Sequence, residues 1–154
     1  MNVYEEAKKF KKKYPFTVAW RLKKNSSIIE KYVNPDEKIK YVFVGQKSES
    51  LFDIFSTAVV AITDKRILIG RKRVVFGYFL NSVMPYMYND LSIKTGLLWG
   101  KVYIDTVKEL VILSHLSKAS LDEIETAIST YMIRMKKEYP GKKPGDAPFE
   151  VKDK

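Results

Sequence analysis

The sequence lacks cysteine altogether and contains a single histidine among its 154 residues. Disulfides, thiolate metal sites and cysteine nucleophiles are therefore excluded, and so is any site built on paired imidazoles. The seven glycines are scattered, and the pattern of a phosphate-binding loop is absent. Neither Ser114 nor Ser117 has a base–acid pair to activate it, and Asp122 and Glu123 fit the start of a helix. We therefore expect no enzymatic activity, no metal and no cofactor.

Long hydrophobic runs are also missing, and none approaches the roughly 18 residues that a membrane span needs. The lysines near the N-terminus have no apolar stretch behind them, so we expect no secretory signal and a cytoplasmic location. A hydrophobic content of 45% argues against general disorder. The length is that of one domain, with room for attached terminal segments.

Basic residues outnumber acidic ones, giving a net charge of +10, and the excess is concentrated in residues 1–24. Such a segment suggests an anionic partner: nucleic acid, an acidic membrane surface or an acidic protein. A solvated helix face is the simpler explanation of the same charges. Two clusters are the candidate contacts for an anionic surface: Lys8, Lys9, Lys11, Lys12 and Lys13, and Arg71, Lys72 and Arg73.

The first helix is expected near the N-terminus, over residues 2–14. Its apolar residues, from Val3 to Tyr14, recur at intervals of three and four, and Pro15 ends the pattern. Phe10 and Tyr14 lie on this apolar face. They could insert into a membrane, pack on the rest of the domain, or pack on a second copy of the chain.

A second short helix is expected up to Val33, with Asn25 or Ser26 as its N-cap. Residues 1–35 would thus form a helical extension. The two tryptophans, Trp20 and Trp99, are expected to anchor packing in the two halves of the structure.

The residues that follow change from helical to alternating periodicity, which predicts about seven strands joined mostly as meanders. One strand, at residues 57–63, is almost entirely apolar, as expected for a strand covered on both faces. The turn Asp64-Lys65 then requires an antiparallel return strand. The expected strands are residues 39–44, 57–63, 66–71, 74–80, 91–94, 97–105 and 107–113.

The clearest helix comes last, with apolar residues from Leu121 to Met135 on one face and a capping box of Ser120 and Glu123. Its apolar face can close the open end of a curled sheet. His115, just before it, is expected at the surface or at a cap. Residues 139–154 are expected to form a disordered tail.

Residues 61–69, Ala-Ile-Thr-Asp-Lys-Arg-Ile-Leu-Ile, resemble the strand–turn–strand signature of bacterial pleckstrin-homology (PH)-like domains and the related GRAM domains. Residues 86–93, Gly96 and residues 100–106 are similar to later strands of the same family. The resemblance covers roughly residues 36–135. It implies an α+β, mainly β fold: a PH-like seven-stranded antiparallel barrel over residues 36–138, capped by its C-terminal helix, with added N-terminal helices.

The resemblance also implies a non-enzymatic binding module, and several bacterial members look like self-assembling modules that use sheet edges. Phosphoinositide-binding relatives place several basic residues around the first inter-strand loop. Here residues 45–51 and Asp53 supply one lysine against two acids, which departs from that pattern.

The leading hypothesis is therefore a module that self-associates as a homo-oligomer or scaffolds another protein. A peripheral membrane module that uses the lysine-rich helix for weak anionic contact is the first alternative. A nucleic-acid binder is the weakest alternative. Such sites interleave basic residues with stacking aromatic residues, but the aromatic residues of this chain are equally expected in ordinary strands.

Overall fold

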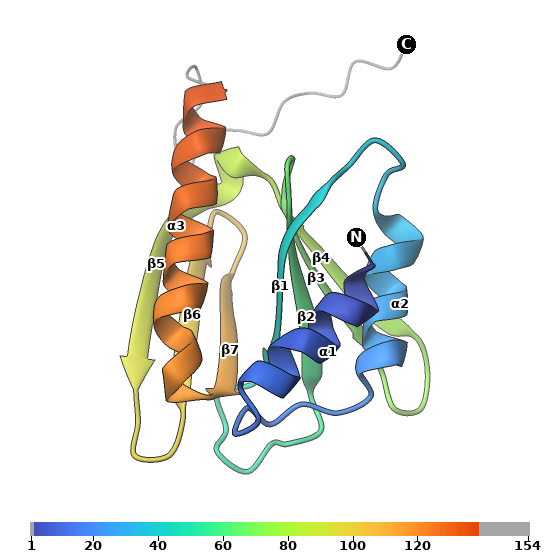
Figure 1. Cartoon of the computed structure of the whole chain (residues 1–154), viewed down its shortest axis with the longest axis vertical. Helices are drawn as coiled ribbons and strands as arrows, with labels where there is room; N and C mark the ends of the chain where they lie inside the picture. Colours follow the sequence, from blue (N-terminus) through green and yellow to red (C-terminus); the bar gives the residue numbers. More distant parts are fainter. Residues whose placement is uncertain (1, 139–154) are drawn as a thin grey trace.

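The computed structural model in Figure 1 describes residues 2–138, so the tail predicted at 139–154 lies outside the described residues. Its helices and strands follow one another in the predicted order. None of the described helices is long and apolar enough to cross a bilayer. The elements are α1 (Val3–Lys13), α2 (Leu22–Tyr32), β1 (Ile39–Gln46), β2 (Thr57–Thr63), β3 (Ile67–Lys72), β4 (Tyr78–Val83), η1 (Pro85–Met87), β5 (Tyr88–Thr95), β6 (Gly100–Thr106), β7 (Leu110–Leu116), η2 (Lys118–Ser120) and α3 (Leu121–Glu138).

The seven strands form one antiparallel sheet in the order β4-β3-β2-β1-β7-β6-β5. β1 and β7 are paired only where Gln46 meets Ser114, whereas the other neighbours pair over most of their length. α3 lies along β5 and β6 (Figure 1), and it buries Ile124, Ile128 and Met135. The predicted fold class, a seven-stranded antiparallel β structure with a C-terminal helix and added N-terminal helices, is confirmed.

α2 packs on one face of β2, β3 and β4. Every residue of β2 is buried, so both faces of this strand are covered. Cross-strand pairing puts Val59 and Gly70 on the same face. A Cβ atom on Gly70 would lie 2.8 Å from Ile29 Cγ1, so the missing side chain lets α2 approach the strand closely.

α1 packs against β1 and α2, and its apolar residues enter the common core. The ring of Phe10 lies 6.2 Å from that of Phe43 and 6.5 Å from that of Tyr41, measured between centroids. Phe10 and Tyr14 are therefore packed on the domain. Of the three roles open to them in the sequence, the structure selects this one.

The β3–β4 hairpin differs from the prediction, which started a strand at residue 74. β4 begins at Tyr78, paired with Lys72, and residues 73–77 form the turn. The Arg73 amide donates to the Gly77 carbonyl at 3.0 Å, and Gly77 takes the left-handed φ of +72°. The apolar residues before Gly77 match a strand pattern, but periodicity alone does not show whether a residue has a cross-strand partner.

The caps of two helices also differ from the predictions. α2 begins at Leu22, so Asn25 lies inside it; its amide donates to the Trp20 carbonyl and accepts from the Lys72 amide. Before α3, the Ser120 hydroxyl donates to the Ser117 carbonyl in η2 instead of forming a capping box. In both cases a tertiary or local partner replaces the helical amide that the sequence pattern suggested.

Candidate functional site

Three strand connections and the α1–α2 connection lie at one end of the molecule. The end of β7 pairs with the end of β1, through Ser114 and Gln46, and with the start of β6. Because neighbouring strands are antiparallel, the β1–β2, β3–β4 and β5–β6 connections all lie at this end. The α1–α2 connection joins them, since the Val18 amide donates to the His115 carbonyl at 2.9 Å. We call residues 14–21, 47–56, 73–77 and 96–99 the loop end.

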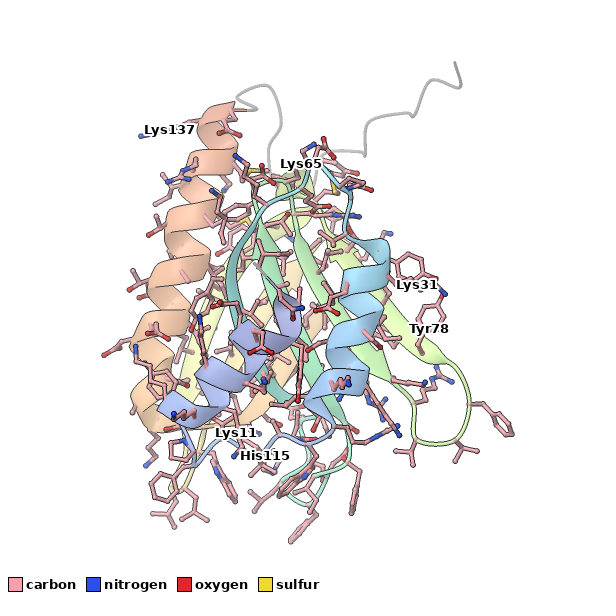
Figure 2. All side chains as sticks on the ribbon, turned by 45° about the vertical axis from the view of Figure 1, so that its right-hand side comes forward. Lys11, Lys31, Lys65, Tyr78, His115 and Lys137 are labelled. Carbon is pink, nitrogen blue, oxygen red and sulfur yellow. The ribbon has the colours of Figure 1, made fainter. Side chains whose placement is uncertain are left out.

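Most of the exposed large hydrophobic side chains among the described residues project from the loop end. Phe52 is 88% exposed, Phe76 83% and Leu97 90%. In Figure 2 this end lies around His115, opposite the end that holds Lys65. Apolar side chains gathered within polar surroundings mark an interaction surface. The full set is Phe16, Trp20, Leu51, Phe52, Phe55, Val74, Val75, Phe76, Leu97 and Leu98.

His115, predicted at the surface or at a cap, is instead only 3% exposed and holds the loop end together. Its Nε2 donates to the Leu51 carbonyl oxygen at 2.7 Å, because a carbonyl can only accept. Its Nδ1 lies 2.9 Å from Ser114 Oγ. The backbone takes a left-handed φ of +57°, which histidine tolerates better than most residues. A lone histidine gives no sequence signal for such a kink.

Other side chains tie the loops to one another and leave their apolar tips outside. Trp99 Nε1 donates to the Phe16 carbonyl at 2.9 Å, and the Lys118 ammonium donates to the Leu97 carbonyl at 2.7 Å. Trp99 therefore anchors the structure as predicted, whereas Trp20 is half exposed. Because these hydrogen bonds fix the main chain of the loops, the loop conformation does not depend on a bound partner.

The loop end is also basic. Its four loops and the two residues on either side of each contain only two acids, Glu49 and Asp53. Lys72 and Arg73 are exposed, while Arg71 lowers the pKa of Asp53 electrostatically, as the weakest of several causes led by the Ser56 hydroxyl. The basic residues of the same segments are Lys12, Lys13, Arg21, Lys23, Lys47, Arg71, Lys72, Arg73, Lys94 and Lys101.

The lysines of α1 are mostly engaged within the domain. Lys13 Nζ lies 2.5 Å from a Glu123 oxygen, and Lys11 Nζ donates to the carbonyls of residues 15 and 17. Lys8 and Lys9 pair with acids one turn earlier in the helix, at 3.0 and 3.1 Å. Within residues 2–138, Lys12 is the member of this cluster that makes no such contact. Both predicted basic clusters have members in or beside the loop end: Lys12 and Lys13 of the first, and Arg71, Lys72 and Arg73 of the second.

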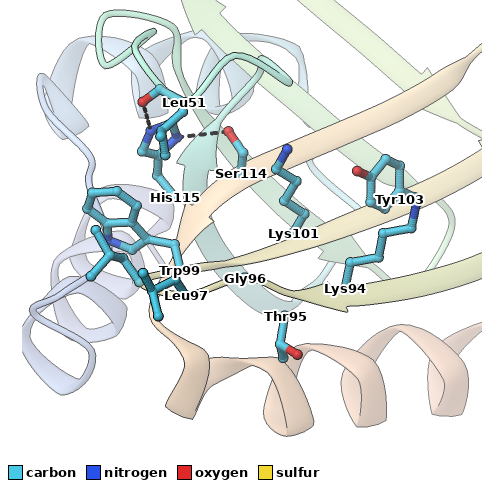
Figure 3. Close-up of a pocket in the computed structure, with 11 residues that line it drawn as sticks. Leu51, Lys94, Thr95, Gly96, Leu97, Trp99, Lys101, Tyr103, Ser114 and His115 are labelled. Carbon is cyan, nitrogen blue, oxygen red and sulfur yellow. Dashed lines mark hydrogen bonds between the residues drawn. The ribbon is translucent and has the colours of Figure 1, made fainter.

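A pocket of about 580 Å³ opens at the loop end, between the β5–β6 turn, β7 and the β1–β2 loop (Figure 3). The rings of Trp99 and His115 are in contact in it, with centroids 4.9 Å apart and planes inclined at 45°. Lys94 and Lys101 reach it from the two strands that flank the turn. The pocket is thus apolar on the loop side and cationic on the strand side.

At the opposite end, polar groups are paired and buried. The Glu37 side chain is fully buried; it accepts from Arg66 Nη2 at 3.0 Å and from the Thr63 hydroxyl at 2.6 Å. Thr63 Oγ1 accepts from the amides of Lys65 and Arg66, both at 3.0 Å. Burial raises the pKa of Glu37, but these hydrogen bonds outweigh it and leave the pKa below its usual value. We call Glu37, Thr63 and Arg66 the turn lock.

The turn lock includes Thr63 and Arg66, the first and last residues of the Thr-Asp-Lys-Arg sequence on which the family resemblance rests. The sequence model of the family described as Bacterial PH domain matches residues 33–130. The chain belongs to this family. The match begins after α1 and α2, so these two helices precede the part of this PH domain that the family shares.

Among solved structures, the chain is similar to a pleckstrin homology domain from Shewanella amazonensis SB2B. The two share 12% sequence identity, over 75% of this chain and 88% of that one, with a TM-score of 0.43. No curated protein matches the chain.

Sequence reasoning found the basic residues but missed the apolar loop tips. Val74 and Phe76 fall in the strand predicted at residues 74–80, and Leu97 and Leu98 in that predicted at 97–105, but in the structure both pairs lie in turns. The available signal was the run Arg-Lys-Arg-Val-Val-Phe-Gly at residues 71–77, in which basic and apolar residues lie side by side before a turn glycine.

Proposed function

We propose that this PH domain is a non-catalytic binding module that docks on anionic bilayers through the loop end. The observation that carries the proposal is the combination of exposed Phe, Leu and Val side chains with a surplus of basic residues on the same four loops. Peripheral membrane proteins use this combination, because apolar groups enter the headgroup boundary while cations attract acidic lipids.

The magnitudes favour a joint contribution of charge and insertion. A basic residue close to an acidic bilayer contributes about 1 kcal/mol, so Arg71, Lys72 and Arg73 together supply about 3 kcal/mol. Burying a phenylalanine side chain contributes roughly 1.5–3 kcal/mol, so Phe52 and Phe76 supply about as much again or more. The sum corresponds to roughly micromolar binding, which neither contribution reaches alone.

An anionic bilayer fits this surface better than a second copy or another protein does. Two loop ends facing each other would bring like charges together, which opposes self-association through this surface. Energetically dominant residues of protein interfaces are mostly Trp, Tyr and Arg, with Leu and Val under-represented. The exposed apolar side chains of the loop end are, apart from Trp20, all Phe, Leu and Val.

Sedimentation with vesicles of phosphatidylcholine and phosphatidylglycerol tests the insertion of the apolar tips. We expect the double variant Phe52→Ser, Phe76→Ser to bind at least about 100-fold more weakly than the natural chain, because it loses two inserted rings. The matched control is Ile133→Ser, which removes a side chain of α3 that is 59% exposed but far from the four loops in the chain. Equal binding of the double variant and the control would refute insertion.

A second comparison tests which basic cluster meets the bilayer. Lys72→Gln with Arg73→Gln removes two exposed charges beside the loop end, and Lys8→Gln with Lys9→Gln removes two charges of α1. We expect the first pair to weaken binding about tenfold or more and to reduce its sensitivity to salt. A larger effect of the α1 pair would restore the lysine-rich helix as the contact.

Self-association through sheet edges, the leading hypothesis from the sequence, stays a prediction. The outer edges belong to β4 and β5, and β5 exposes Asp90 and Lys94, charges of the kind that discourage edge pairing. Light scattering over a wide range of protein concentration tests it. A dimer that persists in the loop-end variants would support association through the edges.

A further inference from the structure

The pocket beside the loop end has an apolar wall that no other part of the described chain covers. Leu51 and Leu98 are 57% and 64% exposed, and Leu97, at the tip of the β5–β6 turn, is 90% exposed. The turn itself is closed, because the Gly96 amide donates to the Trp99 carbonyl at 2.8 Å. The wall is therefore held in place while its side chains face solvent.

The strand side of the pocket is cationic. Lys94 Nζ lies 5.0 Å from the centre of the Tyr103 ring, and Lys101 Nζ donates to the Glu49 carbonyl at 3.1 Å. Neither lysine forms an ion pair among the described residues. Burial, and then the Glu49 carboxylate, raise the pKa of Tyr103, so its hydroxyl remains a donor. An anionic group at this side would meet two ammonium groups that pair with no carboxylate among the described residues. The Glu49 carboxylate also lies nearby, but it accepts from the Tyr103 hydroxyl at 3.3 Å.

The floor of the pocket is rigid. His115 is fixed by its hydrogen bonds to Leu51 and Ser114, and the indole of Trp99 is fixed by its bond to the Phe16 carbonyl. These bonds connect the floor to three of the four loops that carry the apolar tips. The pocket therefore adjoins the loops whose exposed apolar side chains would contact a surface.

We infer that this pocket takes one acyl chain of an anionic phospholipid, with the headgroup at Lys94 and Lys101. The inference rests on the proposed docking of the loop end, because the bilayer then presents acyl chains at the leucine wall. The lysines lie on the strands directly behind the β5–β6 turn, where a headgroup would remain when its chain enters the pocket. The apolar wall would bind the acyl chain, and the two ammonium groups would favour an anionic headgroup.

Fluorescence of Trp99 tests the inference without a bilayer. The chain has two tryptophans, so Trp20→Phe leaves Trp99 as the sole reporter, and residue 20 does not line this pocket. The probes are dihexanoyl phosphatidylglycerol and dihexanoyl phosphatidylcholine, both as monomers below their micelle concentrations. We expect saturable changes in Trp99 emission with the anionic lipid, and binding of the zwitterionic lipid about tenfold weaker.

Two further variants make the test specific. In the Trp20→Phe background, Lys94→Met with Lys101→Met should reduce anionic-lipid binding about tenfold and leave the zwitterionic lipid unchanged. The matched control, Lys8→Met with Lys9→Met on α1, should change neither. Equal binding of the two lipids to the parent protein, or an absence of saturable change with both, would overturn the inference.

Vesicle sedimentation of the same variants separates this inference from the docking proposal. If vesicles bind normally and monomeric lipid leaves Trp99 unchanged, the pocket inference is wrong and docking stands. If monomeric anionic lipid binds and vesicles do not pellet the protein, docking is wrong and the pocket is a site for dispersed lipid.

Discussion

The two ends of this PH domain are built on opposite principles. At the turn lock, Glu37 is buried against Arg66, and beside it Lys65 pairs with Asp36 at the surface. At the loop end, main-chain groups are tied inward while phenyl and leucine side chains face solvent. The first arrangement stabilises the fold, and the second leaves apolar surface unused by the fold. Residues that explain folding and residues that explain binding are therefore separated along the molecule.

The largest effect on stability is expected at the turn lock. Arg66→Met would leave the buried carboxylate of Glu37 without its cation, and removing one partner of a buried pair costs about 3–5 kcal/mol. Urea unfolding measures this change in the free energy of unfolding. Lys65→Met is the control, since its pair with Asp36 is exposed and screened by water, so its loss should cost far less than that of Arg66. Similar losses in the two variants would contradict a buried lock.

A smaller loss is expected at the base of the loop end. His115→Leu removes both ring hydrogen bonds and leaves the Leu51 carbonyl without its donor, at a cost of about 1–3 kcal/mol. His115→Asn should lose less, because asparagine tolerates the left-handed backbone that leucine resists. Hydrogen exchange should become faster over residues 47–56 in the leucine variant. Unchanged exchange there would show that His115 does not hold the loop.

The pH dependence of stability should follow the turn lock. The pKa of Glu37 lies below its ordinary value of 4.5 in the folded chain. Its stabilising contribution is therefore present above about pH 4.5 and is lost as the pH falls toward the folded pKa. Urea midpoints between pH 7 and 3 should fall less steeply below pH 4.5 for Glu37→Gln than for the natural chain. Parallel pH profiles for the two proteins would show that Glu37 does not contribute to the loss of stability at low pH.

The smallest effect on stability belongs to the apolar tips. Phe76→Ser should change the free energy of unfolding by less than about 0.5 kcal/mol, because the ring is 83% exposed and supports no packing. The same urea experiment measures it. A loss comparable to that of His115→Leu would mean that the tip contributes to the folded core and is not reserved for a partner.

The fold was largely accessible from sequence because its signals are local. Alternating residues gave the strands, the apolar run of β2 showed that both of its faces are covered, and the Thr63–Arg66 turn identified the family. α1 was predicted with its bounds nearly correct, since Asn2 caps it and Pro15 follows it.

The candidate site was less accessible because it depends on contacts between distant segments. Asn25 looked like an N-cap but bonds to the Lys72 amide, 47 residues away. His115 gave no sign of its contact with Leu51, and Val74–Phe76 matched a strand pattern until the Gly77 turn left them without a neighbour. Exposure of an apolar residue is a tertiary property, and the residues beside it in sequence do not report it.

Hydrogen exchange of the whole chain, with and without phosphatidylglycerol-containing vesicles, tests docking through the loop end most directly. We predict slower exchange confined to residues 14–21, 47–56, 73–77 and 96–99, and no change with phosphatidylcholine vesicles. Protection centred on the lysines of α1, or on the outer edges of β4 and β5, would contradict it. So would an exchange pattern that anionic vesicles leave unaltered.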